Sequence, residues 1–359
     1  NLTVATGFGD ITFSGAVGGV QPLSTVALTS TGSTTFSGSV NASVFSQAGT
    51  TGTTILQGGG ITTTSAQTYG NNVSLRVQDV TLTASTVTLN GTLSGAYGLV
   101  VNGNAVFGNE DSDRITLSGT NKALTVTGNT SIYTDSISTS GVQTYGDSTA
   151  DAISLYTTTN LSTASANKDI SFNGTLNSAT SAAKGLTIST GSGAVSFGAA
   201  VGNIYGLGAT SISAGSVAAT STLSIASTAS ITTTTSGTGT QTYTGAVTLG
   251  GTSSFTSSNS NITFSSTLNS LTSARSVTIA AGTGTVTFAG AVGGVLALGA
   301  TTITAGTLNV SDDFYTSGTT TINASSMQTA ATKAFSVISG ASATLNVDSL
   351  VVGAAMTGS

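Results

Sequence analysis

The stretch VTFAGAVGGVLALGATTITAG at residues 286–306 has a near-copy, VSFGAAVGNIYGLGATSISAG, at residues 195–215. A shorter copy, ITFSGAVGGV, occupies residues 11–20. Repetition of one phrase along a chain is typical of repeat architectures, in which each unit buries its apolar face against its neighbours. The repeated phrase therefore indicates a chain that builds length rather than one compact globule.

The composition predicts a folded, all-β chain. Of 359 residues, 47 are Gly and one is Pro, and 38% are hydrophobic, while only 5% are charged. The hydrophobic fraction is too high for disorder. Val, Ile, Leu and Phe alternate with Thr and Ser, as in TVTLNGTL (86–93) and SVTIAAGTGTVTF (276–288), and Gly, Asn or Ser interrupts the pattern every 6 to 9 residues. Alternation with a period of two predicts many short strands.

Four phenylalanines that end β-like phrases are spaced by 94, 90 and 91 residues: Phe13, Phe107, Phe197 and Phe288. This spacing predicts four tandem units of about 90 residues, at 9–102, 103–192, 193–283 and 284–359. A second landmark is a Gln before Thr-Tyr, which occurs at Gln67, Gln143 and Gln241 and is echoed around Gln328. We expect these glutamines to lie at corners between strands.

So many short strands without linkers predict a right-handed parallel β-helix, a β-solenoid that is continuous over residues 1–359. Each unit of about 90 residues would then contain three or four stacked coils. A string of four β-sandwiches is the alternative. We expect it less because sandwich domains usually have linkers and more surface charge than this chain.

The phrases FSGAVGGV, FAGAVGGVLAL, GSGAVSFGAAVG and QTYTGAVTLGGTSSFTSSNSNITFSSTLNS resemble the tandem β-strand repeats of large bacterial surface and secreted proteins, the filamentous-haemagglutinin-like adhesins. The resemblance is clearest over residues 191–310 and extends to most of the chain. It implies a parallel β-helix outside the cell that serves as a stalk, fibre or adhesin. No stretch within residues 1–359 resembles the N-terminal secretion module of that family.

The charged residues argue against several classes of function. The net charge is −5 and the seven cations are scattered singly, whereas a nucleic-acid site needs a clustered basic face. His and Cys are absent, which removes Ser-His-Asp chemistry and the commonest transition-metal ligands. No apolar run approaches the roughly 18 residues of a transmembrane helix. A carbohydrate-active enzyme on a β-helix would need several carboxylates in one groove, and Glu110 is the single glutamate. We therefore do not expect an enzyme.

One acidic cluster is a candidate metal site. Glu110, Asp111 and Asp113 lie within a few residues of one another, directly after Phe107. Carboxylate oxygens are the ligands that Ca²⁺ prefers. The ordered spacing of a calcium loop is missing, so a solvated loop is the stronger interpretation and calcium the weaker one.

Threonine pairs separated by one residue could form a flat ladder that orders water. They occur at 62/64, 81/83, 232/234, 302/304 and 319/321. Their irregular separations predict no ladder at a constant coil spacing.

The expected function is mechanical. The terminal sequences NLTVATGFGDITF and SLVVGAAMTGS are apolar and strand-like, without a capping helix. This pattern predicts subunits that stack head to tail into an extracellular fibre or surface stalk, or else a piece of a longer repeat chain. The alternative is an adhesin that binds a glycan or cell surface through loops around 109–114 or 311–317.

Overall fold

The computed structural model describes residues 1–49, 51–235, 238–338, 341–353 and 355–358. These residues are all-β and contain no helix, and they form the stacked coils of a parallel β-solenoid of about 16 turns. No helix that could cross a membrane was found in this part of the chain. The predicted solenoid is confirmed, and the sandwich alternative is wrong because the strands pair in parallel, as in β1 with β3 and β37 with β39.

The chain divides into two compact units, Asn1–Gly174 and Thr175–Ser359. The strands of the first unit are β1 (Leu2–Gly7), β2 (Ile11–Phe13), β3 (Leu23–Ser30), β4 (Ser33–Phe36), β5 (Val40–Ala48), β6 (Thr53–Leu56), β7 (Gly60–Thr63), β8 (Gln67–Tyr69), β9 (Asn72–Leu75), β10 (Val80–Leu89), β11 (Leu93–Gly95), β12 (Leu99–Phe107), β13 (Arg114–Leu117), β14 (Leu124–Val126), β15 (Thr130–Ile132), β16 (Ser136–Thr139), β17 (Gln143–Tyr145), β18 (Ala152–Leu155), β19 (Thr159–Ser162) and β20 (Ile170–Phe172).

The strands of the second unit are β21 (Thr175–Ser178), β22 (Leu186–Ser189), β23 (Ala194–Phe197), β24 (Thr210–Ala214), β25 (Ser216–Ala219), β26 (Leu223–Ile225), β27 (Ala229–Thr233), β28 (Gln241–Tyr243), β29 (Val247–Leu249), β30 (Ser253–Ser257), β31 (Ile262–Phe264), β32 (Leu268–Ser270), β33 (Val277–Ala280), β34 (Thr285–Phe288), β35 (Thr301–Val310), β36 (Phe314–Thr316), β37 (Thr320–Thr329), β38 (Ala334–Val337), β39 (Ala343–Val352) and β40 (Ala355–Gly358).

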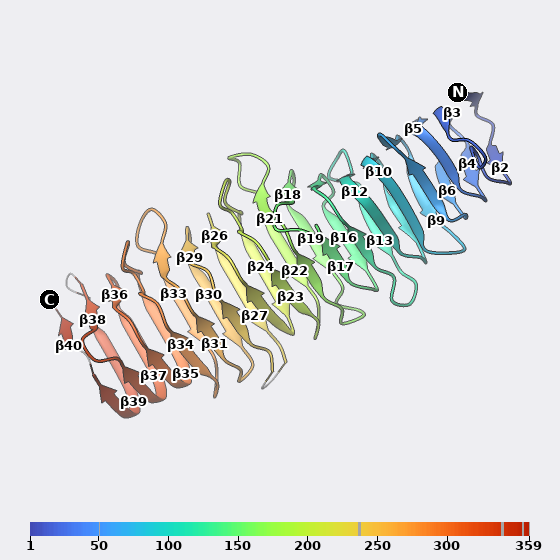
Figure 1. Cartoon of the computed structure of the whole chain (residues 1–359). Coiled ribbons are helices and arrows are strands. Elements are labelled where there is room, and N and C mark those ends of the chain that lie inside the picture. Colours follow the sequence, from blue (N-terminus) through green and yellow to red (C-terminus); the bar gives the residue numbers. More distant parts are fainter. Residues whose placement is uncertain (50, 236–237, 339–340, 354, 359) are drawn as a thin grey trace. The chain divides into compact units, whose positions relative to one another are not determined.

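Within each unit, equivalent strands of successive coils pair into parallel columns (Figure 1). One column of the first unit runs β2, β4, β6, β9, β11, β13, β16 and β19, and its register partners lie 19 to 24 residues apart. Each coil adds one strand to a column and buries its apolar side chains on the coils before and after it. The core is therefore continuous within a unit, whereas surface loops can vary in length.

Aromatic side chains stack along the core. The ring of Phe264 lies 4.9 Å from Tyr243, 5.4 Å from Phe288 and 5.3 Å from Phe255, measured between ring centroids. All of these side chains are fully buried. Strand alternation explains the arrangement, because every second residue points inward and register pairing places Tyr243, Phe264 and Phe288 on consecutive coils.

The Gln-Thr-Tyr motifs are part of the core. In β28, Gln241 Nε2 donates to the backbone oxygens of Ile231 (3.2 Å) and Thr256 (2.7 Å), and the Tyr243 hydroxyl donates to Gln241 Oε1 (3.0 Å). The motifs of β8 and β17 make the same set of bonds. All three glutamines are completely buried, so each one cross-links coils from inside. The echo at Gln328 is different, since that side chain is exposed and Met327 points inward.

Some glycines are required where adjacent coils approach closely. Gly103 has a φ of 132°, and a Cβ added there would lie 1.9 Å from the Ala84 oxygen. Gly60 has a φ of 122° and would place a Cβ 1.9 Å from the Thr81 oxygen. Only glycine occupies this backbone region without strain.

The repeat of about 90 residues has a structural basis in the second unit. Val195 and Val286, in the two near-copies of the opening phrase, belong to one column and are separated by four coils, through Val217, Gln241 and Ile262. In the first unit, the phenylalanine landmark does not mark one position. Phe13 pairs with Phe36, whereas Phe107 pairs with Leu89 and Ile132 in another column.

Candidate functional site

The predicted acidic cluster lies in the turn after β12. Asp113 is buried, and its Oδ2 accepts a hydrogen bond from the Asn109 amide at 3.0 Å. Its own amide donates to the Glu110 oxygen at 3.2 Å. Glu110 and Asp111 are exposed. No three acidic side chains come close enough to hold a metal ion in the described part of the chain. Asp113 therefore closes the turn, and the calcium prediction gains no geometric support.

A second turn repeats this construction. Gly108 and Gly146 both have a φ of 78°, and an aspartate five residues later, Asp113 or Asp151, folds back against each glycine. Asp151 Oδ2 accepts from the amides of Asp147 and Ser148, both at 3.0 Å. The two aspartates stabilise their turns in the same way, because a carboxylate accepts strong hydrogen bonds from backbone amides.

A polar cleft of about 280 Å³ lies beside the first of these turns and is lined by Gly70, Asn71, Asn72, Asn90, Gly91, Asn109, Glu110 and Asp113. Asn71 is only 1% exposed, and its Oδ1 accepts from Thr54 Oγ1 at 2.8 Å. Its Nδ2 has no hydrogen-bond partner among the described residues. An unsatisfied buried donor costs about 1–3 kcal/mol, so this group gains from a ligand that accepts a hydrogen bond.

A partly exposed aromatic pair occupies the same corner of the first unit. The rings of Tyr133 and Tyr156 are stacked with centroids 4.0 Å apart and an interplanar angle of 15°. Tyr156 is 38% exposed. Partial burial, together with the hydrogen bond to Tyr156, raises the pKa of Tyr133 above its ordinary value. Next to this pair, Arg114 Nη2 lies 3.3 Å from Asp135 Oδ2.

Backbone hydrogen bonds connect the cleft to the aromatic pair. The residues that follow successive strands are Asn90, Gly108, Tyr133 and Tyr156, whose amides donate to the oxygens of Tyr69, Leu89, Phe107 and Ile132. These residues therefore form one corner column with a spacing of about 4.8 Å per coil. We call the cleft and the two tyrosines together the polar corner.

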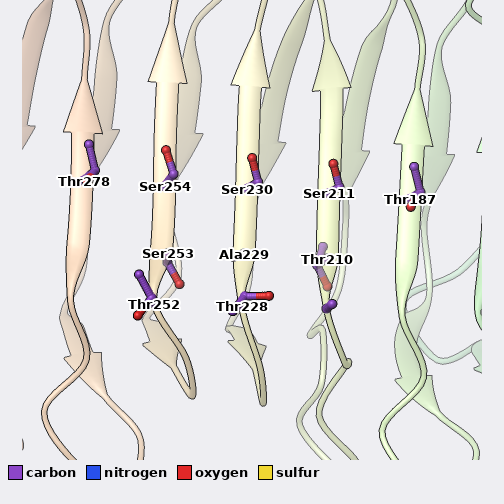
Figure 2. A pocket seen from close by; sticks show the side chains of 11 residues that line it. Thr187, Thr210, Ser211, Thr228, Ala229, Ser230, Thr252, Ser253, Ser254 and Thr278 are labelled. Atoms are coloured by element: carbon purple, nitrogen blue, oxygen red, sulfur yellow. The ribbon is translucent and has the colours of Figure 1, made fainter.

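The second unit carries a ladder of hydroxyl groups (Figure 2). One outward row comprises Thr187, Ser211, Ser230, Ser254, Thr278, Thr302, Thr321 and Thr344, which are register partners on successive coils. We call this row the hydroxyl face. A shallow trough of about 420 Å³ lies over its first five members and the neighbouring Thr210, Thr228, Thr252 and Ser253.

The spaced threonines align in part, although no column consists of threonine pairs throughout. Thr62 and Thr83 are register partners, and Thr232 and Thr304 belong to one column, through Thr256 and Ala280. The coils differ in length, so residues at irregular separations in the sequence still align on the surface.

The segment 311–317 is largely built into the fold. Phe314 is fully buried in β36, and Asp313 Oδ1 accepts from the Ala334 amide at 2.9 Å. Asp312 forms an ion pair with Lys333, and this hydrogen bond lowers the pKa of the carboxyl group. The segment therefore offers less free surface to a ligand than the polar corner does.

No family model, curated protein or solved structure matches this chain. The residues themselves thus carry every functional argument. The polar corner unites one predicted loop, 109–114, with Asn71, Tyr133 and Tyr156, to which no motif in the sequence points. Each tyrosine directly follows the last residue of a short strand, Ile132 of β15 or Leu155 of β18. This shared position is the feature of the sequence that could have indicated the pair.

Proposed function

We propose that the protein is an extracellular structural protein, a subunit of a fibre or surface stalk that extends by end-to-end stacking of β-solenoid coils. The observation that carries this proposal is that two strands, β1 and β39, each have one edge without a neighbouring strand in the described residues. β1 pairs with β3 and β39 pairs with β37, and neither has a second neighbouring strand in the described part of the chain. Open edges present a row of backbone donors and acceptors to another strand.

The side chains at the β39 edge favour such an extension. β39 pairs with β37 over nearly its whole length, from Ala343 to Val352, and exposes Leu350, Val351 and Val352. An added coil would cover Leu350 and Val352, which are the register partners of the buried Met327 and Thr329. A head-to-tail contact between identical chains does not close on itself, so it produces a growing fibre.

The distribution of charge supports close packing of copies. The second unit contains three acidic and three basic residues, and no charged residue belongs to its hydroxyl face. Little electrostatic repulsion therefore opposes side-by-side association of this face.

Electron microscopy of the purified chain at increasing concentration tests the proposal. We expect fibres, and fibre diffraction should show a spacing of about 4.8 Å along the fibre axis. Leu350→Lys should block growth, because Leu350 is the register partner of the buried Met327 and a lysine there would place an unpaired charge against the core of the next coil. Val295→Lys, at an 88% exposed position outside the strands, should not block it. Dispersed monomers of the unaltered chain at high concentration would refute stacking of copies.

Intact mass spectrometry of the native material distinguishes stacked copies from a longer chain. A mass near 34.7 kDa in isolated fibres supports separate subunits. A much larger mass means that further coils of the same chain cover the edges. The extracellular location rests on the resemblance to surface proteins, and protease accessibility on intact cells tests it.

A further inference from the structure

We propose that the polar corner of the first unit binds an uncharged glycan chain, with the sugar rings against Tyr133 and Tyr156 and the sugar hydroxyls in the cleft. This inference concerns a ligand site and holds whether or not the chain forms fibres.

The tyrosine pair provides a platform for a sugar ring. Aromatic faces carry partial negative charge, and the axial C–H groups of a pyranose carry partial positive charge, so the two surfaces attract and also exclude water from each other. At a centroid distance of 4.0 Å the two rings cover one face of each other, so a sugar would contact their outer faces and edges, and Tyr156 remains 38% exposed. A core role would bury both rings, as it does for Tyr69 and Tyr145.

The cleft provides both kinds of hydrogen-bonding group that sugar hydroxyls require. The carboxylate of Glu110 and the side-chain oxygen of Asn90 can accept hydrogen bonds, whereas Asn72 Oδ1 already accepts one from the Thr92 amide at 2.9 Å. The Asn71 Nδ2 is a buried donor without a partner in the described residues. A sugar hydroxyl both donates and accepts, so it can satisfy an amide and a carboxylate together. Small ligand sites commonly combine one flat or apolar surface with a few polar groups.

The charge of the first unit selects against acidic glycans. Nine of the 12 acidic residues and four of the seven basic residues lie in Asn1–Gly174. Of the groups at the corner, Arg114 is the cation and already pairs with Asp135. An acidic sugar would meet Glu110 and Asp113 as like charges. An uncharged chain avoids this repulsion.

The geometry also favours an oligosaccharide over a single sugar. From Gly70 through Asn90, Gly108 and Tyr133 to Tyr156 there are four coil spacings. At about 4.8 Å each, this distance is on the order of 19 Å. Several linked sugar rings are needed to contact the cleft and both tyrosines together.

An array of neutral and acidic hexasaccharides, followed by calorimetry with the best neutral probe, tests the inference. We expect saturable binding to at least one neutral hexasaccharide that exceeds binding to the acidic ones. Tyr156→Ala should weaken it about tenfold through loss of the stacked ring. Tyr156→Phe should retain it because the ring remains.

The matched control is Tyr205→Ala, which removes a tyrosine that is 42% exposed in the second unit and should leave binding unchanged. Circular dichroism of each variant verifies the fold. No saturable binding to any neutral hexasaccharide would overturn the proposal. So would equal affinities of Tyr156→Ala and the unaltered chain, or loss of binding in EDTA, which would mean that a cation rather than direct hydrogen bonding holds the sugar.

Discussion

Substitution of Gln241 by Leu gives a direct test of how the coils are held together. Its side-chain amide donates to the Ile231 and Thr256 oxygens, and its Oε1 accepts from the Tyr243 hydroxyl at 3.0 Å. Leu has a similar volume but no polar atom. The substitution therefore deprives three polar groups of their partner without opening a large cavity.

The expected loss in the free energy of unfolding is about 3 kcal/mol, from about 1 kcal/mol for each of the three groups. The second substitution Tyr243→Phe removes one of these groups, the tyrosine hydroxyl. The double variant Gln241→Leu/Tyr243→Phe should therefore recover about 1 kcal/mol relative to Gln241→Leu.

Urea unfolding followed by far-ultraviolet circular dichroism measures these differences, and hydrogen exchange locates them. Faster exchange should concentrate in β27, β28 and β30, the strands that contribute to this cluster. Gln328→Leu is the matched control, because that glutamine is exposed on β37, and it should change stability by less than about 0.5 kcal/mol. Equal stabilities of the Gln241→Leu and Gln328→Leu variants would refute the role assigned to the buried glutamine.

Three further predictions concern packing, backbone and pH. Phe264→Ala should cost about 3–5 kcal/mol in urea unfolding because its ring is buried among three others, whereas Phe8→Ala, at a 94% exposed position, should be nearly neutral. Gly103→Ala should cost at least about 1–3 kcal/mol through its positive φ and the contact with the Ala84 oxygen, and Gly15→Ala, with no atom within 4 Å of its Cβ, is the control; equal midpoints would contradict this reasoning. Burial raises the pKa of the three Gln-Thr-Tyr tyrosines above 10.0, the pKa of a tyrosine in the unfolded chain. Their contribution to the free energy of unfolding is therefore complete below pH 10.0 and is lost as the pH rises above it. Stability should fall by about 1.4 kcal/mol per pH unit for each tyrosine, and a flat profile from pH 9 to 11 in the urea midpoint would contradict their burial.

The candidate site shows how far the sequence could lead. The sequence pointed to Glu110, Asp111 and Asp113 because acidic residues are rare in this chain. It could not show that Asp113 is used to close its turn, which depends on a hydrogen bond to the Asn109 amide. The pairing of Tyr133 with Tyr156 was also hidden, since 22 residues of intervening chain separate two rings that stack on consecutive coils.

The fold class follows from the amino-acid sequence alone. Alternation of apolar and hydroxyl residues fixes which side of each strand is buried, and a repeated phrase without linkers fixes a stack of similar coils. Which residues share a column becomes clear only in the folded chain, because register partners lie 18 to 27 residues apart and the length of each coil is not evident from its sequence. For this reason Phe13 and Phe107 belong to different columns, and serines and threonines at irregular separations form the hydroxyl face. Surface function in a solenoid depends on that register, which the side chains and turns of every coil set together.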